Sequence, residues 1–196
     1  MKISSPEYWD KQFKEGKTGW DIGYVSPPIK AYIDQLTDKS LKILIPGAGN
    51  AWEVEYLFNN RFKNTFLLDF SKEGIRRFLD RCPAFPGNHI LCEDFFEHDK
   101  KYDLILEQTF FSSFPPWARK DFVAHINKLL NPGGKYVGLL FNRTFPFEGP
   151  PYGGTEKEYL TLFKNLFFIQ KMEIAYNSIK PRKEKELFVV LRKKSG

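Results

Sequence analysis

A glycine turn and, one predicted strand later, a lone carboxylate are the residues of this chain best suited to chemistry. Residues 41–50 read LKILIPGAGN and residues 64–69 read NTFLLD, which places Asp69 twenty residues after Gly49. A Gly-x-Gly turn brings backbone N–H groups close to a ligand, and an acid at the end of the next strand accepts hydrogen bonds from two ribose hydroxyls. This spacing predicts a nucleoside site.

The size of Trp52 separates two candidate nucleoside cofactors. A dinucleotide-binding fingerprint requires a small residue three positions after its second glycine, where helix and strand pack closely. Counted from Gly49, that position is Trp52, whose side chain is too large for so close an approach. The sequence therefore disfavours NAD and favours S-adenosylmethionine, which has no pyrophosphate.

Two further polar clusters follow predicted strands. Residues 92–96 read CEDFF, so that Asp94 and Phe95 are placed to hold an adenine amino group and ring. A charged turn without a ligand would read the same way. Residues 107–111, EQTFF, follow the strand predicted at 102–106. Their polar side chains would face the methionine end of the cofactor, or would simply solvate the strand end.

Helices and short apolar strands alternate through the middle of the chain, and this alternation predicts a doubly wound α/β sheet with parallel strands and right-handed crossovers. After it, two strands at 168–176 and 186–192 are joined by a basic loop with no helix between them, so they pair antiparallel or straddle a neighbour. The other elements predicted are strands at 42–45, 65–68, 89–92, 102–106 and 135–141, and helices at 4–16, 26–36, 50–58, 71–81, 117–130 and 155–167.

Composition bounds the class of protein. A chain of 196 residues with 42% hydrophobic and 28% charged residues fits one globular domain. The net charge of +6 is modest, and its basic clusters at 180–185 and 192–194 come with no nucleic-acid-binding motif, so we expect no nucleic-acid partner. Some of the 20 Phe residues are expected to line a ligand pocket.

Cysteine and histidine usage argues against metal and disulfide chemistry. Cys82 and Cys92 are too few for a disulfide framework, and the three histidines show no metal-ligand spacing with them. Residues 1–6 carry no apolar run typical of a signal peptide, and no later stretch approaches the length of a membrane span. We therefore expect a soluble cytoplasmic protein without metal or membrane, and a monomer by default.

Eight segments occur in one order along nearly the whole chain: YWD (8–10), GWDIG (19–23), IPGAGN (45–50), LDFS (68–71), EDFF (93–96), YDLILE (102–107), NPGG (131–134) and GPPY (149–152). Together they resemble the thiopurine S-methyltransferase superfamily. Within it, Asp69 and the GPPY segment resemble the halide/thiol methyltransferase branch more than the thiopurine branch.

The resemblance implies a class I methyltransferase fold, with a mostly parallel sheet of about seven strands and a terminal antiparallel strand. It also implies a single domain over residues 1–196, in which residues 1–40 form an N-terminal helical lid and residues 41–196 a Rossmann-like core. The implied cofactor is S-adenosylmethionine, which becomes S-adenosylhomocysteine.

The resemblance also implies roles for individual residues. Phe13 and Gln108 stand where plant halide enzymes tend to have Trp and Tyr, which leaves the choice of substrate open. The implied cofactor-binding residues are Trp9, Phe13 and Trp20 as an aromatic lid, Gly47 and Gly49 at the methionine moiety, Gln108 beside the methionine or the transferable methyl, Asp69 on the ribose, Asp94 with Phe95 at the adenine, and Phe70.

The implied reaction is an in-line methyl transfer to a small soft nucleophile such as a thiol, bisulfide, halide or related chalcogen species. Such nucleophiles need no strong general base, and none of the three histidines lies in a matched segment. Tyr152 and Arg143 are the candidate catalytic residues at the substrate end. Two alternatives stay open: a small-molecule O or N acceptor, and a catalytically silent protein that binds the cofactor.

Overall fold

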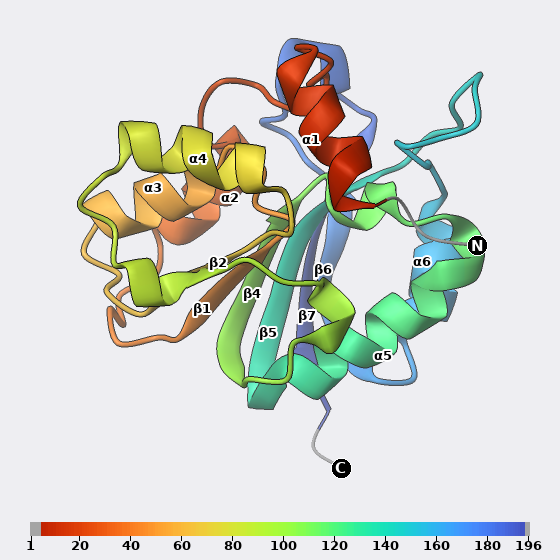
Figure 1. Ribbon diagram of the computed structural model, residues 1–196. Helices are drawn as coiled ribbons and strands as arrows, with labels where there is room; N and C mark the ends of the chain where they lie inside the picture. The colour runs from red at the N-terminus through yellow and green to blue at the C-terminus, as the bar shows by residue number, and fades with distance from the viewer. Residues whose placement is uncertain (1–4, 195–196) are drawn as a thin grey trace.

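Seven strands form one sheet at the centre of the computed structural model, which describes residues 5–194 (Figure 1). Their order is β3-β2-β1-β4-β5-β7-β6; β1 to β5 run parallel, and β7 is antiparallel to both β5 and β6. This confirms the predicted fold class and the antiparallel ending. The strands are β1 (Ile43–Pro46), β2 (Thr65–Leu68), β3 (Ile90–Leu91), β4 (Tyr102–Gln108), β5 (Leu130–Phe141), β6 (Phe167–Ile174) and β7 (Glu186–Lys193).

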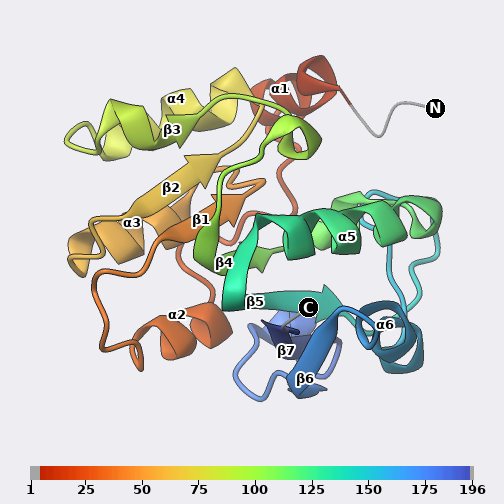
Figure 2. The ribbon, with the colours of Figure 1, turned by 90° about the horizontal axis from the view of Figure 1, so that it is seen from below.

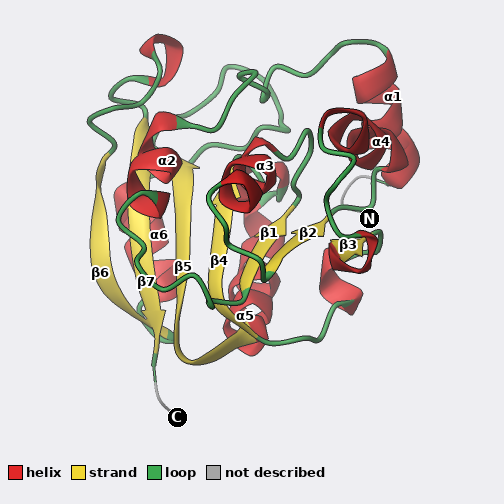
Figure 3. Cartoon of the chain, turned by 90° about the vertical axis from the view of Figure 1, so that its left-hand side faces the viewer, coloured by secondary structure: helices red, strands yellow, loops and turns green. Residues whose placement is uncertain are grey.

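Helices cover both faces of the sheet (Figures 2 and 3). Because side chains alternate along a strand, Ile43 and Ile45 pack with α2, α3 and α4 on one face, whereas Leu44 packs into the core beneath α5 and α6 on the other. Burial on both sides explains why the strands read as continuous apolar runs. The helices are α1 (Pro6–Lys14), α2 (Pro27–Ile33), α3 (Trp52–Asn59), α4 (Lys72–Arg81), α5 (Arg119–Leu129) and α6 (Glu156–Phe163).

Most element boundaries differ from the predicted ones by one to three residues, and two helices and one strand illustrate the differences. Residues 116–118 form a separate 3₁₀ turn, so α5 begins at Arg119 and not at residue 117. Helix α6 begins with the predicted capping box at Thr155 but ends at Phe163, because a turn at 164–166 leads directly into β6. Strand β5 begins at Leu130, which pairs with Tyr102; the register along β4 is interrupted at the NPGG segment, where Gly133 has a φ of +73°, and resumes at Lys135.

Helix α1 lies beside α4 above the carboxyl edge of the sheet (Figure 1). The Asp10 carboxylate accepts hydrogen bonds from the Ser71 hydroxyl at 2.6 Å and from the Glu73 N–H at 3.1 Å, so it satisfies free donors in the first turn of α4. The Arg77 guanidinium donates to the Phe13 carbonyl at 2.6 Å. These contacts fix α1 over the edge where the predicted site residues lie.

Helix α2 packs differently from the rest of the predicted lid. Its buried residues Ile29 and Ile33 belong to the core shared with α3. Within residues 5–40, therefore, α1 and the segment that follows it to Trp20 face the site, and α2 supports the sheet. No helix of the described chain is long and apolar enough to cross a membrane.

Candidate active site

The glycine turn after β1 adopts a backbone that favours glycine. Gly47 and Gly49 have φ values of +58° and +57°, in the left-handed region. A Cβ atom added at Gly47 would lie 1.9 Å from the Phe110 ring, which packs against the bare Cα. The turn lies between β1 and β4, where the strand order reverses, and this is where open α/β sheets bind ligands.

Asp69 is buried at the end of β2 and fixes the glycine turn. One carboxylate oxygen accepts from the Gly49 N–H at 2.8 Å and the other from the Ser71 N–H at 2.8 Å. Burial raises the pKa of Asp69, and these backbone hydrogen bonds oppose that shift. Each oxygen keeps a further lone pair, so the carboxylate still has acceptor capacity for ribose hydroxyls.

A cavity of about 1100 Å³ opens between α1 and the carboxyl edge of the sheet. Gln108 lies instead in an adjoining hollow of about 30 Å³, and Tyr152 lines neither space. The ten other predicted site residues all line the large cavity: Trp9, Phe13, Trp20, Gly47, Gly49, Asp69, Phe70, Asp94, Phe95 and Arg143.

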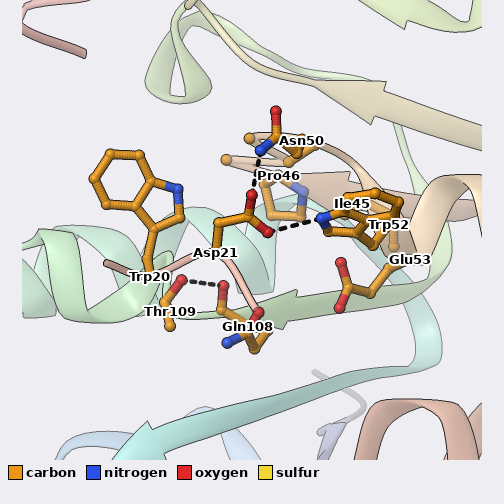
Figure 4. A pocket seen from close by; sticks show the side chains of 12 residues that line it. Trp20, Asp21, Ile45, Pro46, Asn50, Trp52, Glu53, Gln108 and Thr109 are labelled. Carbon is orange, nitrogen blue, oxygen red and sulfur yellow. Dashed lines mark hydrogen bonds between the residues drawn. The ribbon is translucent and has the colours of Figure 1, made fainter. Parts of the chain in front are cut away.

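The small hollow holds two buried polar atoms that have no partner within residues 5–194 (Figure 4). They are Asn50 Oδ1, an acceptor, and Gln108 Nε2, a donor. An amino acid end group carries both an ammonium donor and a carboxylate acceptor, so this pair of atoms complements it. The hollow, next to the glycine turn, therefore presents one free acceptor and one free donor of the kind that an amino acid end group would bind.

Asp21 connects the segment after α1 to the glycine turn. Its carboxylate accepts hydrogen bonds from the Asn50 amide and, at 2.7 Å, from the Trp52 indole (Figure 4). The Arg81 guanidinium lies 3.8 Å from the centre of the Trp52 ring. Trp52, whose size argues against NAD binding, therefore anchors Asp21 and, through it, the neighbouring Trp20 beside the glycine turn.

A Trp52→Phe variant is expected to lower the free energy of unfolding by about 1.5–3 kcal/mol and to weaken S-adenosylhomocysteine binding about tenfold. The ring and its contact with Arg81 stay, whereas the hydrogen bond to the charged Asp21 is lost, and such bonds contribute about 1.5–3 kcal/mol. Isothermal titration calorimetry and thermal unfolding measure the two quantities. Wild-type affinity in a folded Trp52→Phe protein would show that this contact does not position the lid.

The predicted aromatic lid forms a connected cluster. Trp20 packs edge-to-face with Trp9 at 5.1 Å and with Phe13 at 5.5 Å between ring centres. The Trp20 carbonyl accepts from Arg182 at 2.8 Å, and Arg182 also pairs with the buried Glu186 at 3.5 Å. The negative faces of aromatic rings attract a cation such as a sulfonium.

Arg182 is a cavity residue that sequence reasoning missed. It lies 162 residues from Trp20, in the loop that the sequence presented only as a basic connection. Several aromatic residues of the cavity wall were also missed, because a high Phe content predicts that some line a pocket and not which ones. They are Phe96, Phe110, Phe114, Trp117, Phe141 and Phe145.

The GPPY segment enters the site through its prolines. Pro150 and Pro151 line the cavity, whereas Tyr152 is held by its backbone. The Tyr152 N–H donates to the Ser112 carbonyl at 2.7 Å, and its own carbonyl accepts from Arg119 at 3.2 Å. The structure therefore does not bring the Tyr152 hydroxyl together with Arg143 at the cavity wall.

Comparison with known proteins agrees with this geometry. The family model for thiopurine S-methyltransferase matches residues 4–194. The chain belongs to the thiopurine S-methyltransferase family. It is 31% identical, over 95% of its length and 84% of the relative's, to a probable thiol methyltransferase 2 of Arabidopsis thaliana. A thiocyanate methyltransferase 1 of Brassica oleracea is 27% identical over 74% of this chain and 66% of its own.

Solved structures show the same fold as this thiopurine S-methyltransferase family member. The crystal structure of a Burkholderia thailandensis 1,6-didemethyltoxoflavin-N1-methyltransferase, with S-adenosylhomocysteine bound, superposes with a TM-score of 0.76. The match covers 100% of this chain and 93% of that one at 16% identity. The fold is therefore that of class I methyltransferases. Family membership makes the chain an S-adenosylmethionine-dependent methyltransferase, as the sequence predicted.

Proposed function

We propose that this thiopurine S-methyltransferase family member methylates a small soft nucleophile: a thiol, bisulfide, halide or related chalcogen species. The observation that carries the proposal is the wall beyond the cofactor residues. It is aromatic and proline-rich and carries the Arg143 guanidinium, and no histidine is among the residues that line the cavity. Such a wall suits a polarizable anion that needs no proton removed by a strong base.

The chain's own residues would divide the work as follows. The glycine turn, Asn50 and Gln108 hold the methionine moiety, Asp69 holds the ribose, and Asp94 and Phe95 flank the adenine. When bound, S-adenosylmethionine supplies an electrophilic methyl group. Trp9, Phe13 and Trp20 cover it and keep out water, and the aromatic wall holds the nucleophile in line, which is the main catalytic requirement of an already activated group.

The relatives support the same acceptor class, since one is named for thiols and another for thiocyanate. A cavity of about 1100 Å³ also has room for a larger acceptor, so methyl transfer to a small-molecule O or N group is the second candidate. Ser112 and Ser113 on the cavity wall favour it, because their hydroxyls donate to the Thr109 and Phe110 carbonyls and their oxygens can still accept a hydrogen bond from an O–H or N–H group, which a soft anion lacks.

A matched acceptor series tests the proposal. Thiophenol, phenol and aniline share one ring and differ in the attacking atom; bisulfide, thiocyanate and iodide extend the series to small anions. Labelled S-adenosylmethionine is supplied, and S-adenosylhomocysteine and volatile methylated products are measured. Turnover of sulfur or halide acceptors supports the proposal. Turnover of phenol or aniline alone would replace it with the second candidate.

Arg143→Gln is expected to raise the KM for bisulfide or thiocyanate about tenfold, with no change in S-adenosylhomocysteine affinity. Arg143 is half-buried in the cavity wall, lies 4.7 Å from the centre of the Phe145 ring, and has no ion-pair partner within the described chain. Its charge is therefore available to an anionic acceptor.

Tyr152→Phe is the comparison variant for Arg143→Gln, because the sequence pointed to both residues. The backbone contacts of Tyr152 do not depend on its hydroxyl, so we expect KM and kcat within about twofold of wild type. A large loss of kcat in Tyr152→Phe with an unchanged KM in Arg143→Gln would reverse these two assignments. Steady-state kinetics with labelled cofactor gives both constants.

A further inference from the structure

Thr109 has an unusual backbone for its residue type. It follows the last residue of β4 and has a φ of +69°, in the left-handed region. A β-branched side chain is strained there, at roughly 1–2 kcal/mol, and such strain persists only where the surroundings fix it. The Ser112 hydroxyl, which donates to the Thr109 carbonyl at 2.6 Å, helps to fix it.

Thr109 stands where the two spaces of the site meet. It lines both the small hollow, which carries the unpartnered Asn50 and Gln108 atoms proposed to bind the amino acid end, and the large cavity, which carries the proposed nucleoside and acceptor walls. Trp20, Gly47 and Gly49 are the other residues common to both linings. In S-adenosylmethionine the sulfonium joins the methionine chain to the nucleoside, so this boundary is the place for the sulfonium and its methyl group.

The Thr109 hydroxyl has free acceptor capacity at this boundary. Its Oγ1 donates its only proton to the Gln108 carbonyl at 2.5 Å (Figure 4). Within residues 5–194 no group donates a hydrogen bond to Oγ1, so both lone pairs are available. The strained backbone places an oxygen acceptor, and no further donor, beside the boundary.

We propose that Thr109 is a cofactor-contacting residue whose hydroxyl oxygen recognises the methyl-sulfonium group. The inference rests on the proposed placement of the cofactor. The hydrogens of a methyl group on a positively charged sulfur are polarized, and C–H···O contacts to an oxygen lone pair stabilise them. During transfer the acceptor's electron pair forms the new bond to the methyl carbon, and the old carbon–sulfur pair returns to sulfur; Thr109 neither gains nor loses a proton.

The ratio of affinities for S-adenosylmethionine and S-adenosylhomocysteine tests this role, because the two ligands differ only in the methyl group and its charge. Thr109→Val keeps the branched shape and removes the hydroxyl. Thr109→Ser keeps the hydroxyl and serves as the matched control. Thr109→Gly removes the hydroxyl while relieving the backbone strain, so it remains informative if Thr109→Val folds poorly. Isothermal titration calorimetry measures the four pairs of constants, one pair for the wild type and one for each variant, without turnover.

The expected result is a change in the affinity ratio that depends on the hydroxyl at position 109. In Thr109→Val and Thr109→Gly the ratio of the affinity for S-adenosylmethionine to that for S-adenosylhomocysteine is expected to fall about two- to fivefold. Thr109→Ser is expected to keep the wild-type ratio. Equal weakening of both ligands in Thr109→Val and Thr109→Gly would overturn the inference, because it shows a structural role only. A wild-type protein that binds neither ligand would overturn the cofactor placement itself.

Discussion

Asp69→Ala is expected to weaken S-adenosylhomocysteine binding about 100-fold and to lower the free energy of unfolding by about 2–4 kcal/mol. The first effect follows from the loss of charged hydrogen bonds to the ribose, at about 1.5–3 kcal/mol each. The second follows because the Gly49 and Ser71 N–H groups, now bonded to Asp69 at 2.8 Å each, lose their acceptors.

The two effects of Asp69→Ala are measured separately, by calorimetry well below the unfolding temperature and by urea denaturation. Asp69→Asn keeps one acceptor oxygen and is expected to fall between Asp69→Ala and wild type in both. Asp80→Ala is the control: it removes an exposed carboxylate of α4 that forms a surface ion pair with Arg76, so both the affinity and the stability should stay close to wild type. Full cofactor affinity in Asp69→Ala would show that the carboxylate serves the turn and not the ribose.

Glu107→Gln is expected to flatten the pH dependence of stability between pH 4.5 and 7. Glu107 is 1% exposed; its carboxylate accepts from the Tyr136 hydroxyl at 2.7 Å and from the Phe111 N–H at 3.2 Å. Burial raises the pKa of Glu107 from 4.5 to about 7. The folded state therefore favours the protonated carboxyl.

The sign of the Glu107 effect follows from this raised pKa. Its contribution to stability is fully present below the unfolded pKa of 4.5 and is lost as the pH rises through about 7. The difference between the two pKa values corresponds to about 3 kcal/mol in the free energy of unfolding. A glutamine at this position accepts from the Phe111 N–H and donates to the Tyr136 oxygen, so both hydrogen bonds persist without a titrating group.

Urea denaturation of wild type and Glu107→Gln at pH 5, 6, 7 and 8 measures the Glu107 effect. The difference between the two proteins is the informative quantity, because burial also raises the pKa of Glu53 and Glu186 in both of them. Glu97→Gln, at an exposed position, is the control and should follow wild type. Parallel curves for wild type and Glu107→Gln would mean that Glu107 does not titrate in this range.

Local patterns predicted most of the fold correctly. Strand β2 has the predicted ends at 65 and 68, and Ser71 caps α4 as expected, because apolar runs and capping residues act within a few positions of one another. The glycine turn and Asp69 were predicted in the same way, from one strand, one turn and one acid. The structure adds that the Asp69 carboxylate also accepts a hydrogen bond from the Gly49 N–H in the turn, a contact that the sequence spacing alone does not reveal.

Long-range contacts could not be predicted from the sequence. Arg182 reaches Trp20 only because β7 enters the sheet between β5 and β6 and carries the preceding loop to the carboxyl edge. The left-handed backbone of Thr109 depends on the packing of the turn after β4 and has no glycine to signal it. Tyr152 was chosen for its place after two prolines, and only the fold shows that its backbone, and not its hydroxyl, is engaged.

A crystal structure with S-adenosylhomocysteine tests the central claim most directly, which is that the cofactor lies across the carboxyl edge between β1 and β4. The account predicts the ribose hydroxyls on Asp69, the amino acid end in the hollow with Asn50 and Gln108, and the sulfur beside Thr109 beneath Trp20. A ligand bound elsewhere, or with its ribose away from Asp69, would contradict it.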